Sequence, residues 1–187
     1  MTTSLAASVP VAWLVARAAG VVALGLLTLS TWLGLGMSTR LLGARRMKPL
    51  LAWHRTLVWT GLSVIGLHVV ALVADRTIHF GVAAVLVPFV APWHPAAVAA
   101  GVTAGWLMLM VALSFRARKW IGQRGWRRLH YLGFAVFALG LGHALFVGTD
   151  LRGVGGPLVA ALALGPTLWL VFVRILAPAP KPQLQPA

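Results

Sequence analysis

Four histidines form two similarly spaced pairs within apolar stretches of the chain. His68 follows His54 by 14 residues, and His143 follows His130 by 13. Ionisable side chains inside membrane-crossing segments are costly to bury and usually serve a function. On an α-helix these separations correspond to about 21 and about 20 Å along the axis. Each pair therefore predicts one imidazole near the start of a helix and another well inside it.

Two such helices running parallel would place one imidazole each at two different depths. Two nitrogen ligands on opposite sides of an iron are what a six-coordinate b-type haem needs, because both axial positions are then filled and the iron carries one electron at a time. The sequence thus predicts two haems, with His54, His68, His130 and His143 as their iron ligands. Any one of these histidines is also explained by a hydrogen bond to a neighbouring helix. Four at matched depths favour haem.

The rotational positions of the histidines agree on one helix and disagree on the other. Fourteen steps of about 100° bring His54 and His68 to within about 40° of one face. Thirteen steps leave His130 and His143 about 140° apart on an ideal helix. Two explanations stay open: a local distortion at nearby glycines, or two haems at different azimuths.

The other two histidines have no partner at a matching depth. His79 and His94 fall in a segment between apolar runs. We expect them to lie at the surface or the membrane interface and not to bind metal.

The elements that position the histidines are five apolar runs, which cover residues 11–37, 51–74, 96–115, 130–147 and 158–176. A membrane-crossing helix needs about 20 such residues. The apolar segment 78–91 is shorter and contains Pro88, so we expect it to be re-entrant or interfacial. The predicted fold class is an all-α integral membrane bundle of five transmembrane helices plus this segment. Residues 1–176 would form a single haem-binding domain, and the Pro-rich residues 177–187 a disordered cytoplasmic tail.

The composition excludes several classes of protein. Of the 187 residues, 60% are hydrophobic and 10% charged, against about 45–50% and about 25% in soluble domains. The lack of cysteine excludes disulfides, thiolate zinc sites, iron–sulfur clusters and covalent c-type haem. Asp75 and Asp150 are the only carboxylate side chains, so chemistry that needs paired acids or a carboxylate proton relay is also excluded.

The net charge of +14 is an orientation marker in this chain. A basic soluble face would suggest nucleic acid, but here the bases lie in short runs between apolar stretches. Thirteen of the 16 lysines and arginines fall on one side of the five-span arrangement. The positive-inside rule predicts that this side is cytoplasmic, with the N-terminus outside and the C-terminus inside.

Arg17 interrupts the first predicted span and is not among the 13 basic residues on the cytoplasmic side. It lies about six residues below the outer end, near the depth of the outer haem. We expect its guanidinium to pair with a haem propionate, because a desolvated carboxylate needs a cation. The alternative is that Arg17 snorkels to the outer surface.

The spacing of the histidines resembles that of the ferric reductase-like transmembrane domain family. The resemblance rests on the H-x13-H and H-x12-H spacings at His54/His68 and His130/His143, and covers roughly residues 11–176. The phrases Trp126-Arg-Arg-Leu-His130-Tyr131 and His143-x5-Gly148-Thr149-Asp150 look like those of its stand-alone bacterial members. The family includes NADPH oxidases, ferric reductases and the haem subunit of bacterial methionine sulfoxide reductase systems.

The resemblance implies a pairing and a function. His54 would share the inner haem with His130, and His68 the outer haem with His143. The chain would be the haem-bearing part of an oxidoreductase in a bacterial inner membrane, passing electrons from a cytoplasmic or quinol donor to an acceptor outside. The sequence departs from the oxidases and ferric reductases because it carries no G-x-G-x-x-G motif before a helix and no flavin and nicotinamide domain. We therefore expect a separate flavoprotein or quinol as electron donor.

Two other functions stay open at the level of sequence. The chain is also compatible with a cytochrome b subunit or anchor of a larger membrane oxidoreductase complex, although the absence of glutamate argues against a carboxylate-assisted quinol site. The third hypothesis is a non-redox packing or transport subunit whose histidines are structural.

Overall fold

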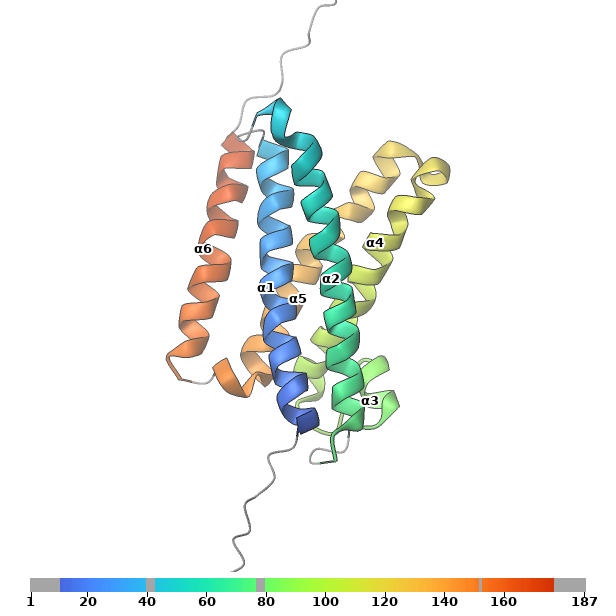
Figure 1. Ribbon diagram of the computed structural model, residues 1–187, viewed down its shortest axis with the longest axis vertical. Coiled ribbons are helices and arrows are strands. Elements are labelled where there is room, and N and C mark those ends of the chain that lie inside the picture. Colours follow the sequence, from blue (N-terminus) through green and yellow to red (C-terminus); the bar gives the residue numbers. More distant parts are fainter. Residues whose placement is uncertain (1–10, 40–42, 77–79, 152, 177–187) are drawn as a thin grey trace, which may run out of the picture.

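The computed structural model describes residues 11–39, 43–76, 80–151 and 153–176. Every regular element in these ranges is helical, which confirms the predicted all-α class (Figure 1). In chain order the elements are α1 (Val11–Thr39), η1 (Ala44–Arg46), α2 (Met47–Ala74), α3 (Val82–Leu86), α4 (Pro95–His130), α5 (Leu132–Val147), η2 (Thr149–Leu151) and α6 (Gly155–Leu176). His79 and the predicted tail 177–187 lie outside the described residues.

Four helical stretches are long and apolar enough to cross a membrane: Val11–Thr39, Met47–Ala74, Pro95–Val147 and Gly155–Leu176. The third is 53 residues long and reverses direction at Gly122, whose φ of 71° and ψ of 168° are non-helical. A positive φ is readily available only to glycine. α4 and α5 pack along each other after this reversal (Figure 1), so the third stretch consists of two antiparallel arms and is not one long span. The molecule is a multi-pass membrane protein.

The reversal lies within the basic connection predicted between the third and fourth runs, but the residues on both sides of it are helical. Arg116, Arg118 and Lys119 lie on the ascending arm of α4, and Arg124 and Arg127 on its descending arm. The sequence predicted a basic connection between residues 115 and 130. Arginine and lysine are good helix formers, so one glycine turns the chain and the basic residues extend both helices beyond the apolar runs.

Small residues form the contacts between the helices. Ala16, Ala19, Ala71, Ala99 and Ala104 are each less than a tenth exposed, whereas many large apolar side chains face outward. In lipid, helices gain little from burying leucine against leucine and associate through close backbone approach. α1 packs along α2 and also contacts α5 and α6 (Figure 1). This arrangement sets α1 between the other helices.

The segment that contains α3 caps one end of the bundle without crossing it. Phe80, Ala84, Val85 and Ala91 form a buried cluster with Val98 at the start of α4. The indole Nε1 of Trp106 donates a hydrogen bond to the carbonyl oxygen of Leu86 at 2.9 Å. At five residues, α3 is far shorter than a span. The prediction of a short segment beside the spans is confirmed.

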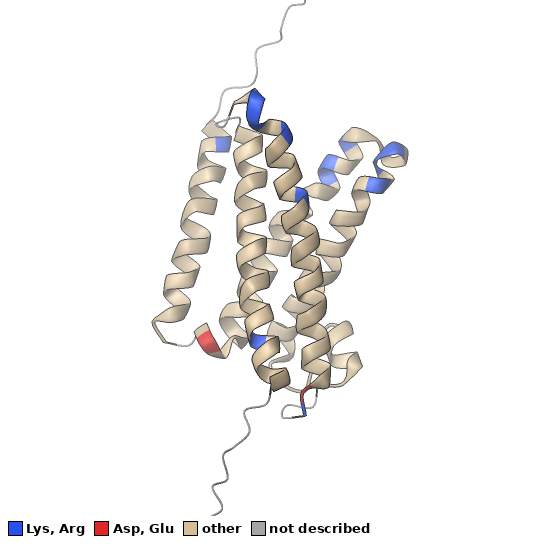
Figure 2. Ribbon diagram, in the orientation of Figure 1, with Lys and Arg blue, Asp and Glu red and all other residues tan. Residues whose placement is uncertain are grey.

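Charge is divided between the two ends of the bundle (Figure 2). Most of the described lysines and arginines gather where α1 joins α2, where α4 turns into its descending arm, and at the end of α6. Both aspartates, Asp75 and Asp150, lie at the opposite end with Arg17. The cytoplasmic location of the basic end stays a prediction of the positive-inside rule.

Candidate functional site: two facing histidine pairs

The structure brings the four predicted histidines together as two pairs. The ring centroids of His54 and His130 are 6.0 Å apart, with an angle of 71° between the ring planes. Those of His68 and His143 are 6.4 Å apart, with an interplanar angle of 85°. Each pair joins a residue of α2 to a residue of α4 or α5. These are the histidines that the resemblance pairs with each other, and their binding of haem stays a prediction.

A break in the helix at Tyr131 allows both histidines of the second arm to face α2. His130 ends α4, Tyr131 lies between the helices, and α5 begins at Leu132. The amide of Phe134 donates to the carbonyl oxygen of Tyr131 at 3.1 Å, which is a tighter turn than that of an α-helix. A 3₁₀ turn rotates the chain by more per residue than an α-helix, so it reduces the mismatch of about 140° expected on an ideal helix without removing it. The distortion lies at Tyr131 and not at one of the glycines.

Three of the four imidazoles are oriented by backbone carbonyl groups on a neighbouring helix. In each case Nδ1 lies within hydrogen-bond distance of a carbonyl oxygen, which only accepts. These bonds join His54 to Ser30 (3.0 Å), His68 to Ala16 (2.7 Å) and His143 to Ala97 (2.9 Å). The geometry assigns the proton to Nδ1 and leaves the Nε2 lone pair for a metal, as is usual for histidine ligands.

His130 is oriented in a different way. The indole of Trp126 stacks on its ring, with centroids 5.0 Å apart and an interplanar angle of 25°. The two residues are four positions apart and so share a face of the helix. Among the described residues no hydrogen bond to the His130 ring is present, so Trp126 is its orienting contact besides His54. Nothing in the sequence pattern around Trp126 indicates this role.

Glycines make room for the histidine rings. A Cβ added at Gly20 would lie 3.2 Å from the His68 ring, and one at Gly101 only 2.6 Å from Nδ1 of His143. Gly101 and Gly105 form a GxxxG pattern that is typical of close helix packing. The two glycines have different surroundings in the structure, because nothing lies within 4 Å of a Cβ added at Gly105. Gly101 is part of the setting of His143, which sequence spacing alone does not reveal.

The donor set suits an iron held mainly by a macrocycle. No group of three or more histidine, cysteine, aspartate or glutamate side chains that could hold a metal ion occurs among the described residues. Two imidazoles are the protein's full share of a six-coordinate haem iron. With a metal–nitrogen bond of about 2.0 Å and a ring centre about 1.1 Å behind the nitrogen, two axial imidazoles on one iron have centroids about 6.2 Å apart. The observed 6.0 and 6.4 Å fit that requirement.

Arg17 lies at the same end of the bundle as the pair of His68 and His143 and has a protein partner. Its Nε donates to Oδ2 of Asp150 at 2.9 Å, and its Nη2 contacts Oδ1 of the same carboxylate. This bidentate pair links α1 to the turn η2 that follows α5. Arg17 has further N–H donors besides those that contact Asp150. The ion pair is therefore compatible with a contact to a haem propionate, which stays a prediction.

The remaining histidines lie apart from the pairs or are not described. His94 packs against Trp93, with ring centroids 4.3 Å apart, in the connection that leads into α4. His79 lies outside the described residues.

These observations define a multi-pass helical membrane protein with two facing imidazole pairs. A scan against protein-family models, a search of curated proteins and a search of solved structures each found no match.

Proposed function

We propose that this chain binds two b-type haems and carries electrons across a membrane. The observation that carries the proposal is the presence of two facing histidine pairs, His54 with His130 and His68 with His143, at centroid distances suited to axial ligation of one iron each. Each haem supplies a one-electron redox centre when bound.

The four histidines would hold the haems through Nε2. The Nδ1–H bonds of three rings to backbone carbonyls fix the tautomer and raise the basicity of the ligating nitrogen. Two histidines on one iron leave no open axial position, which favours electron transfer over binding of oxygen. The protein's part is therefore to set the spacing, orientation and surroundings of the redox centres.

The placement of the pairs supports transfer along the membrane normal. Along α2, His54 and His68 are separated by about 21 Å of helix axis, which is most of a hydrocarbon core of about 30 Å. We propose that electrons enter at the basic end, near His54 and His130, from a flavoprotein or quinol. They would leave near His68 and His143 for an outside acceptor such as a ferric chelate, oxygen or a periplasmic redox protein.

The test is a reduced-minus-oxidised absorption spectrum with haem quantification on the full chain purified from haem-replete cells. We expect a b-type spectrum and two haems per chain. His68→Ala and His143→Ala should each remove the same haem, and His54→Ala and His130→Ala the other. His94→Ala is the matched control and should retain both, because His94 lies outside the pairs.

Three outcomes would contradict the proposal. One haem per chain would defeat the assignment of two sites. Retention of both haems in the His68→Ala, His143→Ala double variant would defeat the ligand assignment. A colourless protein would leave a non-redox role for the histidines. Reduction of the haems by quinol alone would identify the chain as a quinol-linked cytochrome b subunit.

A further inference from the structure

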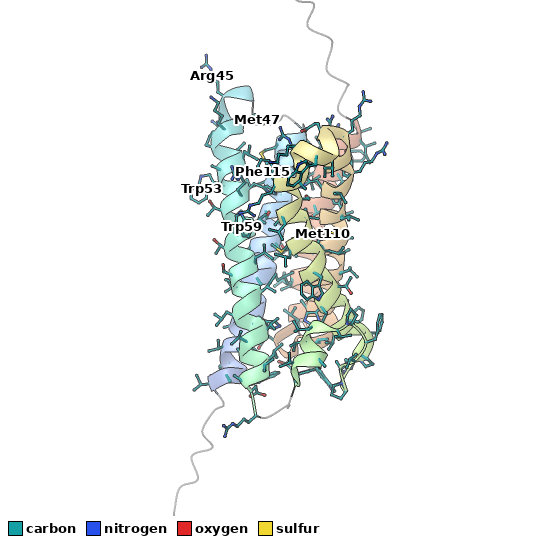
Figure 3. The ribbon with its side chains drawn as sticks, turned by 90° about the vertical axis from the view of Figure 1, so that its right-hand side faces the viewer. Arg45, Met47, Trp53, Trp59, Met110 and Phe115 are labelled. Carbon is teal, nitrogen blue, oxygen red and sulfur yellow. The ribbon has the colours of Figure 1, made fainter. Side chains whose placement is uncertain are left out.

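Three arginines and three aromatic rings interlock between α2 and α4 at the basic end of the bundle. The guanidinium of Arg55 on α2 lies 5.4 Å from the Phe115 ring on α4. Arg116 on α4 lies 5.4 Å from the Trp59 ring on α2. Figure 3 labels Trp59 and Phe115, which lie on the neighbouring helices α2 and α4 toward that end. The two helices thus exchange cation–π contacts in both directions.

Arg118 adds a third cation to the same place. Its guanidinium lies 5.6 Å from the Phe115 ring and 5.8 Å from the Trp126 ring. The Phe115 ring is therefore shared by Arg55 and Arg118. Like charges held around one ring repel each other unless an anion lies between or beside them. We call Arg55, Arg116 and Arg118 the arginine cluster.

No carboxylate side chain lies near the arginine cluster. The chain contains no glutamate, and its two aspartates, Asp75 and Asp150, lie at the opposite end of the bundle (Figure 2). Arg55, Arg116 and Arg118 are all exposed. Another molecule can therefore supply the counter-charge, and the planar fork of guanidinium donors matches the oxygens of a phosphate group.

The depth of the cluster indicates which molecule carries that phosphate. Arg55 lies eight residues into α2, or about 12 Å from the start of the helix. α2 is 28 residues long, about 42 Å, which matches a bilayer of about 40–45 Å including its headgroups. Arg55 is therefore on the flank of the helix, within reach of the headgroup layer by snorkelling. A soluble protein would meet the turns η1 and Gly122 before it reached this flank.

The surface beside the cluster is apolar and open. The exposed fraction is 41% for Trp59, 43% for Phe115 and 40% for Met110. Such a surface next to the cations suits acyl chains next to a phosphate. Basic sites between transmembrane helices bind anionic lipid headgroups in this manner.

We propose that the arginine cluster is a binding site for an anionic phospholipid, with the lipid phosphate between Arg55 of α2 and Arg116 of α4. The site joins α2 and α4, which otherwise meet over a small area. The bound lipid would therefore stabilise the packing of α2 against α4. The proposal depends on the cations and their position and not on the presence of haem.

The test is native mass spectrometry of the full chain, as purified, with equal amounts of phosphatidylglycerol and phosphatidylcholine. We expect retention of phosphatidylglycerol over phosphatidylcholine in the natural sequence. The Arg55→Gln, Arg116→Gln double variant should lose this preference by about fivefold for each arginine. The Arg45→Gln, Arg46→Gln variant is the matched control, since it removes the same charge from exposed positions of η1 at the same end.

Several outcomes would overturn the proposal. Equal retention of the two lipids by the natural sequence does so without any variant. An equal loss in the test and control variants would show unspecific attraction of anions. Loss of the retained phosphatidylglycerol on addition of inorganic phosphate would show a free-anion site. Unchanged lipid retention with a changed haem spectrum would assign the arginines to haem propionates. Unchanged lipid retention with slower reduction by a soluble donor would assign them to a protein partner.

Discussion

Trp126 stacks on His130 at 5.0 Å and 25°, and this contact replaces the backbone hydrogen bond that orients each of the other three paired histidines. The inner pair is therefore asymmetric. His54 is fixed by Ser30 of α1, and His130 by a side chain of its own helix.

The first prediction concerns this contact. Trp126→Leu removes the stacked ring, and His130 gains rotational freedom. Loss of a group that orients a metal ligand typically costs 10–100-fold in affinity, so we expect occupancy of the inner haem to fall while the outer haem stays. Haem titration and redox potentiometry of the two centres measure this. The control is Trp120→Leu in the same arm, which is 76% exposed. Equal losses in the two variants would contradict an orienting role for Trp126.

The pairing of the histidines could be predicted from the sequence because depth depends only on residue separation. The 14- and 13-residue spacings set two levels regardless of how the helices rotate. The common facing of His130 and His143 could not be predicted from an ideal helix, which places them about 140° apart, and the structure interrupts the helix between them at Tyr131. That residue has an ordinary φ of −63° and ψ of −19°, and neither glycine nor proline marks the position.

Other parts of the site depend on contacts between distant residues. Arg17 and Asp150 are 133 positions apart, so the ion pair has no local pattern that reveals it. The glycine beside His143 is indistinguishable in sequence from its GxxxG partner. Gly122 lies in a basic stretch, which favoured a loop between the two spans. The sequence alone did not indicate that both helices extend up to this glycine.

The second prediction uses the two glycines of that motif as a matched pair. Gly101→Ala places a Cβ 2.6 Å from Nδ1 of His143, so the ring must move from its bond to Ala97. We expect reduced occupancy or an altered spectrum of the outer haem alone. Gly105→Ala meets nothing within 4 Å and should leave both haems unchanged. Haem quantification with resolved spectra of the two centres decides the matter. A Gly105→Ala effect as large as that of Gly101→Ala would argue for a general packing role.

The third prediction concerns the ion pair of Arg17 and Asp150. Their side chains are 35% and 39% exposed, so solvent screens the interaction. We expect Arg17→Gln and Asp150→Asn to lower stability with a coupling of about 0.2–1 kcal/mol in a double-mutant cycle. Thermal unfolding in detergent at low and high salt measures it, and the coupling should shrink with salt.

The same two variants distinguish a contact with haem from a contact with Asp150. If Arg17 also binds a propionate of the outer haem, Arg17→Gln shifts the potential of that haem and Asp150→Asn shifts it less. Equal shifts in the two variants would exclude a direct contact between Arg17 and the propionate.

The last prediction tests how the capping segment is held over the end of the bundle. Trp106 donates from Nε1 to the carbonyl oxygen of Leu86, and this bond ties α4 to α3. Trp106→Phe keeps an aromatic ring at the position and removes the donor. We expect a loss of about 0.6–1.5 kcal/mol, confined to the segment around α3, because the buried cluster of Phe80, Val85 and Val98 remains.

Hydrogen exchange measured by mass spectrometry locates the effect. Amides between residues 82 and 94 should exchange about 3–12-fold faster in Trp106→Phe, which is the stated loss converted at about 1.4 kcal/mol per factor of ten. Amides of α1 and α2 should keep their rates. Trp169→Phe is the control, since Trp169 is an outward-facing ring with 63% exposure. Uniformly faster exchange would mean that the bond stabilises the whole bundle and not the cap. Unchanged exchange in the cap would mean that the apolar cluster alone holds it in place.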